Sequence, residues 1–164
     1  MVEQDVGSFE ALHTPALSTG IVYQVYVSEQ RLVAVKIGGQ FDGGKAFTMQ
    51  LGLIGAIIAH FLDKRVQRKR AVLRQLWASR PLDELRALDP KNFELPFEAL
   101  TGVELKKAKL GFLGGSQATL LLRKSEGKPM ELTLQSKAAA MEALRVLEQR
   151  LQGRLQVDPR LRAA

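Results

Sequence analysis

The sequence predicts an α+β fold in which a curved antiparallel sheet or small barrel is closed by a C-terminal helix. Three features predict it: strand-like segments over about 20–37 and 93–136, a helical pattern over about 137–152, and a long helical stretch between the two strand-rich sections. A chain of 164 residues, 46% of them hydrophobic, is long enough for one well-formed core. We therefore expect a single domain over 1–164, with an inserted helical arm over about 46–88 between its second and third strands.

The first strand-rich section is a predicted hairpin. Residues 21–27 and 31–37 are rich in β-branched side chains, and only Ser28, Glu29 and Gln30 separate them. The glycines within 38–44 give the chain a flexible exit toward the arm. The stretch before residue 20 contains His13, and we expect it to be irregular.

The arm joins an apolar segment to a basic one. Residues 46–62 carry no charge, whereas residues 63–80 hold seven basic residues and one acidic residue, a net charge of +6 within the chain's total of +7. The basic segment is predicted to be an amphipathic helix. Its apolar residues recur at helical spacing and are Leu62, Val66, Leu73, Leu76 and Trp77. Pro81 is expected to end this helix or to begin a short second one.

The second strand-rich section has the cleaner pattern. Residues 101–107, 118–123 and 130–135 alternate between apolar and polar side chains, as half-buried antiparallel strands do. Ser136 can serve as the N-cap of the closing helix, and Gly153 stands where a C-terminal glycine belongs. The predicted buried stripe of this helix consists of Ala140, Leu144, Leu147 and Leu151. The tail from Arg154 is polar, and we expect it to be frayed.

Catalytic and metal-binding motifs are not supported. Residues 39–45 match the phosphate-binding pattern G-x-x-x-x-G-K, but Ala46 occupies the position where a magnesium-binding Ser or Thr should follow. The chain has no cysteine and only two histidines, His13 and His60, which argues against a thiolate nucleophile or a first-row metal site. We therefore expect no enzymatic activity, no cofactor, no metal and no small-molecule substrate.

The segment 92–151 resembles the second half of a pleckstrin-homology-like (PH-like, GRAM-like) domain of the uncharacterised bacterial kind. The similar features are the Pro96-Phe97 step, the meander of strands and the closing amphipathic helix. The resemblance implies a small curved sheet capped by one helix, which binds lipids or proteins and has no catalytic residues. Phosphoinositide-binding relatives place a longer basic loop in their first hairpin, whereas the loop over 28–30 is short and acidic.

The apolar part of the arm is compatible with three roles. As a helix, residues 46–62 would span about 25 Å, which is at or just under the thickness of a bilayer core. The segment could form a core or dimer-interface helix, insert shallowly into a membrane, or span it. Small residues spaced four apart predict a helix-packing or oligomer interface at Gly52, Gly55, Ala56 and Ala59.

The basic part of the arm predicts the main binding site. We expect it to engage an anionic membrane surface or an acidic protein partner. The predicted contact residues are Lys64, Arg65, Arg68, Lys69, Arg70, Arg74 and Trp77.

Two alternatives remain for the arm. It could be the assembly interface of a homo-oligomer or scaffold, or it could bind nucleic acid through the basic helix. Nucleic acid is less favoured because aromatic residues, at 6% of the chain, are too few to provide stacking platforms beside the cations. The N-terminal stretch lacks a secretory signal, so a cytoplasmic location is expected, with peripheral association at the inner face of the membrane as an option.

Overall fold

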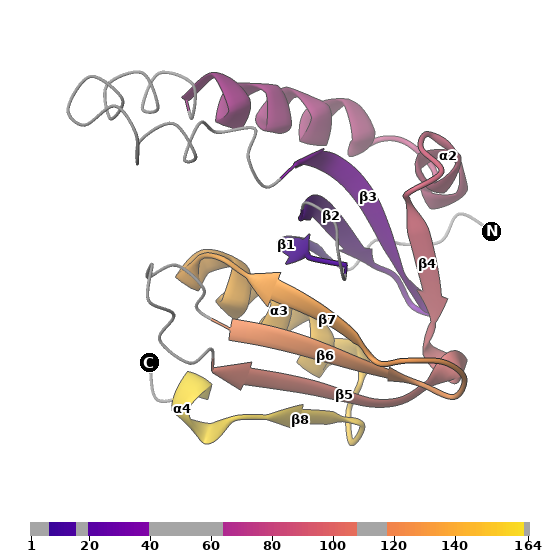
Figure 1. Cartoon of the computed structure of the whole chain (residues 1–164), viewed down its shortest axis with the longest axis vertical. Coiled ribbons are helices and arrows are strands. Elements are labelled where there is room, and N and C mark those ends of the chain that lie inside the picture. Colours follow the sequence, from indigo (N-terminus) through magenta and orange to yellow (C-terminus); the bar gives the residue numbers. More distant parts are fainter. Residues whose placement is uncertain (1–6, 16–19, 40–63, 108–117, 163–164) are drawn as a thin grey trace.

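The structure of the chain is a computed structural model, which describes residues 7–15, 20–39, 64–107 and 118–162. It has a mixed α+β fold built on one open, curved sheet of eight strands (Figure 1). The strand order is β4-β3-β2-β1-β7-β6-β5-β8. The predicted α+β class and the curved sheet are therefore confirmed, with an open sheet in place of a closed barrel.

The sheet has two halves that follow one another in the chain. The first half contains β1 (Gly7–His13), β2 (Ile21–Val27), β3 (Arg31–Gly39) and β4 (Phe93–Pro96), and neighbouring strands pair antiparallel. A helix over residues 64–77 and α2 (Leu82–Ala87) lie between β3 and β4 in the chain.

The second half contains β5 (Leu100–Lys107), β6 (Ala118–Lys124) and β7 (Met130–Leu134), which also pair antiparallel. A short 3-10 helix, η1 (Phe97–Ala99), leads into β5, and α3 (Lys137–Arg150) follows β7. The two halves meet where β1 pairs with β7, at Leu12 and Thr133.

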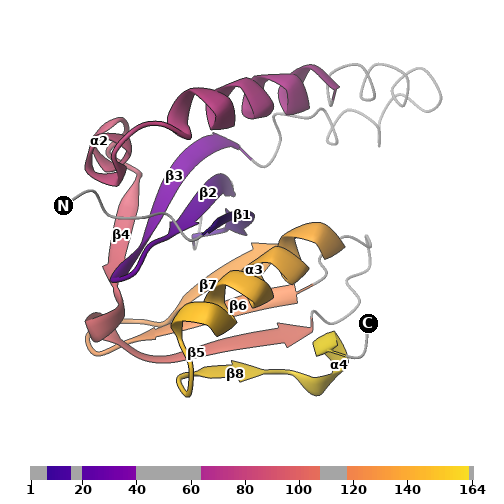
Figure 2. The ribbon, with the colours of Figure 1, turned by 180° about the vertical axis from the view of Figure 1, so that it is seen from behind.

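The main core lies between the two halves of the sheet and α3. It contains the inward side chains of both halves, with Leu144 and Leu147 of α3 among them. The opposite face of the first half is covered by the helix over 64–77, which lies above β3 in both views (Figure 1, Figure 2). Strands β2 and β3 are therefore buried on both faces, which explains why their sequences are continuous β-branched runs.

Strand β1 corrects the prediction of an irregular N-terminal stretch. It pairs with β2 over its whole length and carries His13 as its last residue. Gly7 allows its start to approach α3 closely, because a Cβ atom at this position would lie 2.8 Å from Cγ2 of Val146. The charged Glu10 in the middle of β1 is held by Arg70 of the helix over 64–77, a contact that the local sequence does not reveal.

The C-terminal tail corrects a second prediction, since it is folded and not frayed. Strand β8 (Leu155–Val157) pairs parallel with β5, and α4 (Pro159–Arg162) buries Leu161 against the main core. Asp158 joins the two, because its carboxylate accepts hydrogen bonds from the backbone N–H of Lys107 (3.3 Å) and Arg160 (3.0 Å). Pairing with β5, the Asp158 cap and the burial of Leu161 therefore contribute to the order of a segment that is otherwise polar.

Other local predictions are confirmed. The hairpin turn lies at 28–30, where the Ser28 hydroxyl accepts from the backbone N–H of Arg31 at 3.1 Å. Pro81 precedes α2, as expected of a helix-starting proline. Ser136 caps α3 by accepting a hydrogen bond from the backbone N–H of Ala139 at 3.0 Å.

A candidate binding surface on the helix over 64–77

The helix over 64–77 packs on the sheet through one stripe of side chains. Residues 66, 70, 73, 74 and 77 are buried or half-buried, whereas the other positions of the helix are exposed. This spacing is that of one face of an α-helix. Trp77 contacts two small apolar clusters on the outer face of the sheet, one that includes Tyr26 and Val33 and one that includes Val22 and Ile37. Trp77 is therefore a packing residue, which corrects its expected place on the exposed contact surface.

A carboxylate of the sheet binds two arginines of this stripe. Glu10 on β1 accepts from Nη1 of Arg70 at 3.1 Å and lies 3.7 Å from Nη1 of Arg74. The Arg70 side chain is only 8% exposed, and its Nη2 also donates to the carbonyl oxygen of Gly39 at 3.5 Å. Arg70 was expected to contact an external anion, and the structure corrects this, because a buried guanidinium needs an internal counter-ion.

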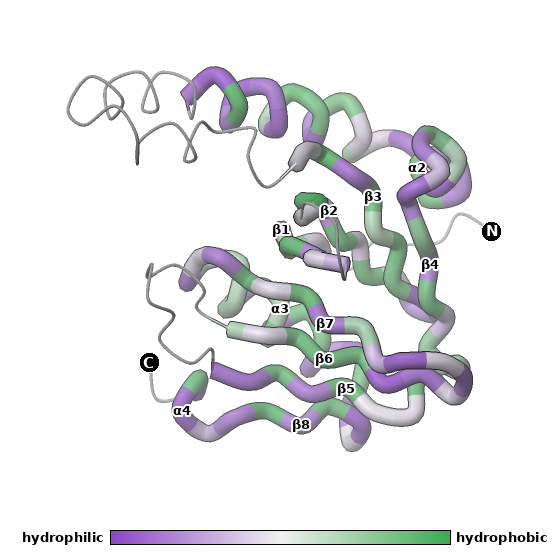
Figure 3. The backbone as a smooth tube through the Cα atoms, in the orientation of Figure 1, coloured by the Kyte–Doolittle hydropathy of each residue, from purple (hydrophilic) through white to green (hydrophobic). Residues whose placement is uncertain are grey.

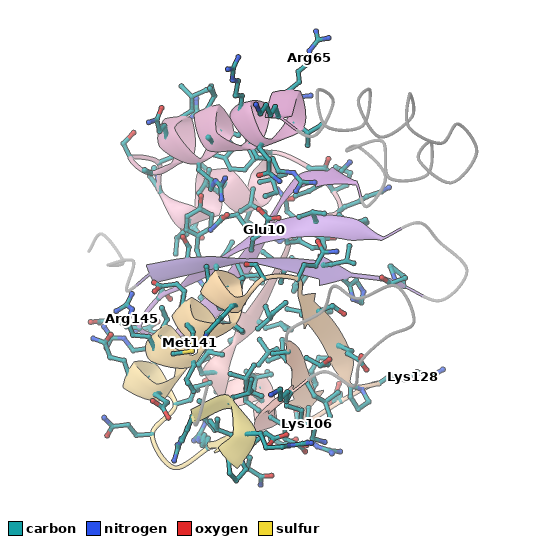
Figure 4. All side chains as sticks on the ribbon, turned by 90° about the vertical axis from the view of Figure 1, so that its left-hand side faces the viewer. Glu10, Arg65, Lys106, Lys128, Met141 and Arg145 are labelled. Atoms are coloured by element: carbon teal, nitrogen blue, oxygen red, sulfur yellow. The ribbon has the colours of Figure 1, made fainter. Side chains whose placement is uncertain are left out.

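The opposite part of the helix forms an exposed surface of mixed character, which we call the outward face. At about 100° per residue, its five side chains fall within one arc of roughly 100°. They are Arg65, Arg68, Lys69, Val72 and Leu76. Figure 4 shows Arg65 projecting away from the domain, while Glu10 lies between the helix and the strands. In Figure 3 the same helix alternates between hydrophilic and hydrophobic residues.

Val72 and Leu76 are the apolar part of the outward face. They are 53% and 58% exposed, and they lie four residues apart on the same side of the helix. Leu76 belongs to the apolar set predicted from helical spacing, yet it does not face the sheet, because Arg70 and Arg74 occupy part of the buried stripe instead. Val72 and Leu76 are two of the four large hydrophobic side chains that are exposed in the described part of the chain, and they lie beside three cations.

The cations of the outward face have no acidic partner among the residues that the structure describes. Elsewhere in the described chain many cations are paired: Arg31 binds Asp83 and Glu94, and Arg123 binds Glu104. Lys64, Arg65, Arg68 and Lys69, by contrast, are all exposed and form no ion pair with a described residue. Because no described carboxylate neutralises them, their positive charge can attract an external anion.

The predicted packing interface at Gly52, Gly55, Ala56 and Ala59 lies outside the described residues, as does His60. The second histidine, His13, has a local role, since its Nδ1 lies 3.0 Å from the carbonyl oxygen of Glu131.

The titratable groups of the described chain show the pattern of structural ion pairs. Hydrogen bonds from Lys106 and Arg123 lower the pKa of Glu104, and a hydrogen bond from Arg145 lowers that of Glu142. Arg160 likewise holds the pKa of Asp158 well below its usual range. A general acid would need a raised carboxyl pKa, and these shifts have the opposite sign.

Two further features are absent from the described ranges. Within them, no group of three or more His, Asp or Glu side chains is arranged to hold a metal ion. The helices of the described segments also include none that is long and apolar enough to cross a membrane.

Comparisons with known protein families, with curated proteins and with solved structures found no match for this chain.

Proposed function

We propose that this protein is a non-enzymatic, PH-like binding module that associates peripherally with an anionic membrane surface through the outward face of the helix over 64–77. The observation that carries the proposal is the combination on that face of three cations without a described acidic partner and two exposed aliphatic side chains. Cations attract anionic headgroups, and aliphatic side chains enter the boundary between headgroups and acyl chains.

The order of the elements supports the PH-like part of the proposal. Four antiparallel strands are followed by three more, and α3 then packs against the core between them. A curved sheet with one helix packed on it is compatible with the fold that the resemblance implies. In this proposal, the helical segment between β3 and β4 and the final β8–α4 segment are additions to the PH-like plan.

The hairpin loops support the helix as the anion-binding element. With β1 included, the first hairpin of the domain joins β1 to β2, and its connection over 14–20 contains no lysine or arginine. The next turn, over 28–30, carries only the acidic Glu29. Because neither loop is basic, the helix over 64–77 is the best source of positive charge on this half of the domain.

The proposal is tested by co-sedimentation of the full chain with vesicles of phosphatidylcholine, with and without phosphatidylserine. We expect binding only to the phosphatidylserine vesicles. We also expect it to weaken with added salt, because interactions between exposed charges are screened beyond about 8 Å at physiological ionic strength and over shorter distances at higher salt. Equal binding to both vesicles, or binding to neither, would contradict the proposal.

Two controls separate the alternatives. Double-stranded DNA is added as a competitor, and we expect vesicles to displace DNA more readily than DNA displaces vesicles, because DNA offers no apolar environment for Val72 and Leu76. The mass in solution is measured by light scattering without lipid. A stable dimer that ignores the vesicles would favour the assembly role of the arm instead.

A further inference from the structure

Glu10 binds two arginines that lie one turn apart on the helix over 64–77. One of its oxygens is 3.1 Å from Nη1 of Arg70, and the other is 3.7 Å from Nη1 of Arg74. Residues four apart on a helix lie on the same side, so a single carboxylate can hold both. Glu10 itself projects from the middle of β1, a strand that is paired on both sides.

Burying the Arg70–Glu10 ion pair under the helix carries a desolvation cost. Arg70 is nearly buried, and its Nε has no hydrogen-bond partner among the described residues. Replacing a buried ion pair by apolar side chains of similar size is often neutral or stabilising, so such a pair is weak support for stability alone. Its better-attested role is to specify one arrangement among several.

The other contacts between the helix and the sheet constrain the rotation of the helix about its own axis less strictly. Trp77 packs on apolar clusters, and Val66 and Leu73 are half-buried. Apolar packing is non-directional, whereas a charge-assisted hydrogen bond fixes the positions of both partners. A rotation of the helix by one residue's step, about 100°, would carry the outward face toward the sheet.

We propose that Glu10 is the positioning residue that sets the rotation of this helix, and thereby turns Arg65, Arg68 and Lys69 with Val72 and Leu76 toward the ligand. The inference deepens the proposed function and rests on it for the identity of the ligand. The rotation itself can be measured without any ligand.

The first test measures the rotation directly. Because the chain contains no cysteine, Val72→Cys and Leu73→Cys each introduce one reporter thiol, at an exposed and a half-buried position of the same turn. In the otherwise unchanged protein, we expect the thiol at 72 to react several-fold faster with a maleimide than the thiol at 73. In a Glu10→Gln background we expect this contrast to collapse. An unchanged contrast would overturn the proposal.

The second test uses the sign of a charge effect. Glu10→Gln raises the net charge from +7 to +8, so attraction to an anionic vesicle alone would tighten binding. If Glu10 positions the helix, Glu10→Gln should instead bind the vesicles more weakly, by about fivefold for each cation that is turned away from the vesicle. The matched control is Glu98→Gln, which makes the same change of charge at an exposed residue of η1 and should not weaken binding. Tighter binding of both variants would contradict the positioning role.

Two more variants protect the test against loss of folding. Arg74→Gln removes the more exposed of the two arginine contacts, leaves Arg70 paired, and should reduce the labelling contrast in part. Glu10→Gln with Arg70→Met removes both members of the buried pair, so the thermal stability should recover relative to Glu10→Gln alone. The labelling contrast should not recover. A contrast restored together with stability would show that Glu10 is merely structural.

The labelling and vesicle results separate the two proposals. If the labelling contrast collapses in Glu10→Gln but the parent protein ignores anionic vesicles, Glu10 positions the helix and the membrane proposal fails. If the parent binds such vesicles and the contrast is unchanged, the membrane proposal survives and the positioning role of Glu10 is excluded.

Discussion

Reversing the three cations of the outward face should abolish binding to anionic vesicles while leaving the fold intact. The variant is Arg65→Glu, Arg68→Glu and Lys69→Glu. Each side chain is exposed and has no ion pair with a described residue, so little native structure depends on it. Surface substitutions of this kind change the free energy of unfolding by about 0.5 kcal/mol or less.

The expected loss of binding is large. Each cation near an anionic membrane contributes about 1 kcal/mol, so removing three costs about 3 kcal/mol, or roughly a hundredfold in the partition coefficient. Reversal adds repulsion to this loss. The assay is vesicle co-sedimentation at several phosphatidylserine contents, with the melting temperature measured on the same samples.

The matched control makes the same change of charge elsewhere on the surface. Lys91→Glu, Lys107→Glu and Lys128→Glu also shift the net charge by six units, at three exposed residues outside the helix over 64–77. If binding depends on the outward face, this control should retain most of its affinity. Equal losses in the two variants would refute the reasoning, since they would show that total charge, and not one face, determines binding.

Three further predictions concern the apolar part of the surface, the core and acid stability. Val72→Ser with Leu76→Ser should weaken vesicle binding without changing its salt dependence, which co-sedimentation across a salt series measures. Leu144→Ala should lower the free energy of unfolding by about 2 to 5 kcal/mol in urea titration, because Leu144 is buried in the main core, and an unchanged midpoint would contradict its placement. The pKa of Asp158 is lowered by Arg160, so this aspartate stabilises the fold above its unfolded pKa of about 4 and loses that contribution as the pH falls below it. Asp158→Asn should therefore flatten the acid side of the stability curve, and a curve parallel to the parent's would argue against the interaction.

Sequence patterns predicted the parts of the fold in which one face of an element meets the core. The alternation of residues 118–123 places Leu120 and Leu122 inside, and the helical spacing of Leu144 and Leu147 identifies the buried face of α3. In these elements, burial is decided by hydrophobicity alone. Local helix caps could also be predicted from the sequence, as the N-cap at Ser136 shows.

The elements that were missed depend on tertiary contacts. Strand β1 pairs with β2 and carries Glu10, whose charge is matched by Arg70 on a helix that is distant in the sequence. Strand β8 has three residues and gains its order from pairing with β5 and from the Asp158 cap. Such short elements have no periodicity of their own to detect.

The charge of the sequence predicted a binding surface on the helix over 64–77. Which residues belong to that surface depends on how the helix packs against the sheet. Lys64, Arg65, Arg68 and Lys69 are exposed, as an anion-binding role requires. Arg70 and Trp77 face the sheet instead, and Leu76 faces outward. Helical spacing alone did not show this, because it treats arginine as a solvent-facing residue. The acidic Glu10 on a distant strand makes the burial of Arg70 possible.

The most direct measurement is the depth of residue 72 in a bound membrane. A Val72→Cys variant is labelled with an environment-sensitive fluorophore, and a Lys128→Cys variant on the turn between β6 and β7 serves as the reference. On vesicles that contain phosphatidylserine and brominated lipids, we predict a blue shift and quenching of the label at 72 and neither effect at 128. A bound protein in which the label at 72 is unaffected, or in which the label at 128 is the one quenched, would contradict the claim that the outward face meets the membrane.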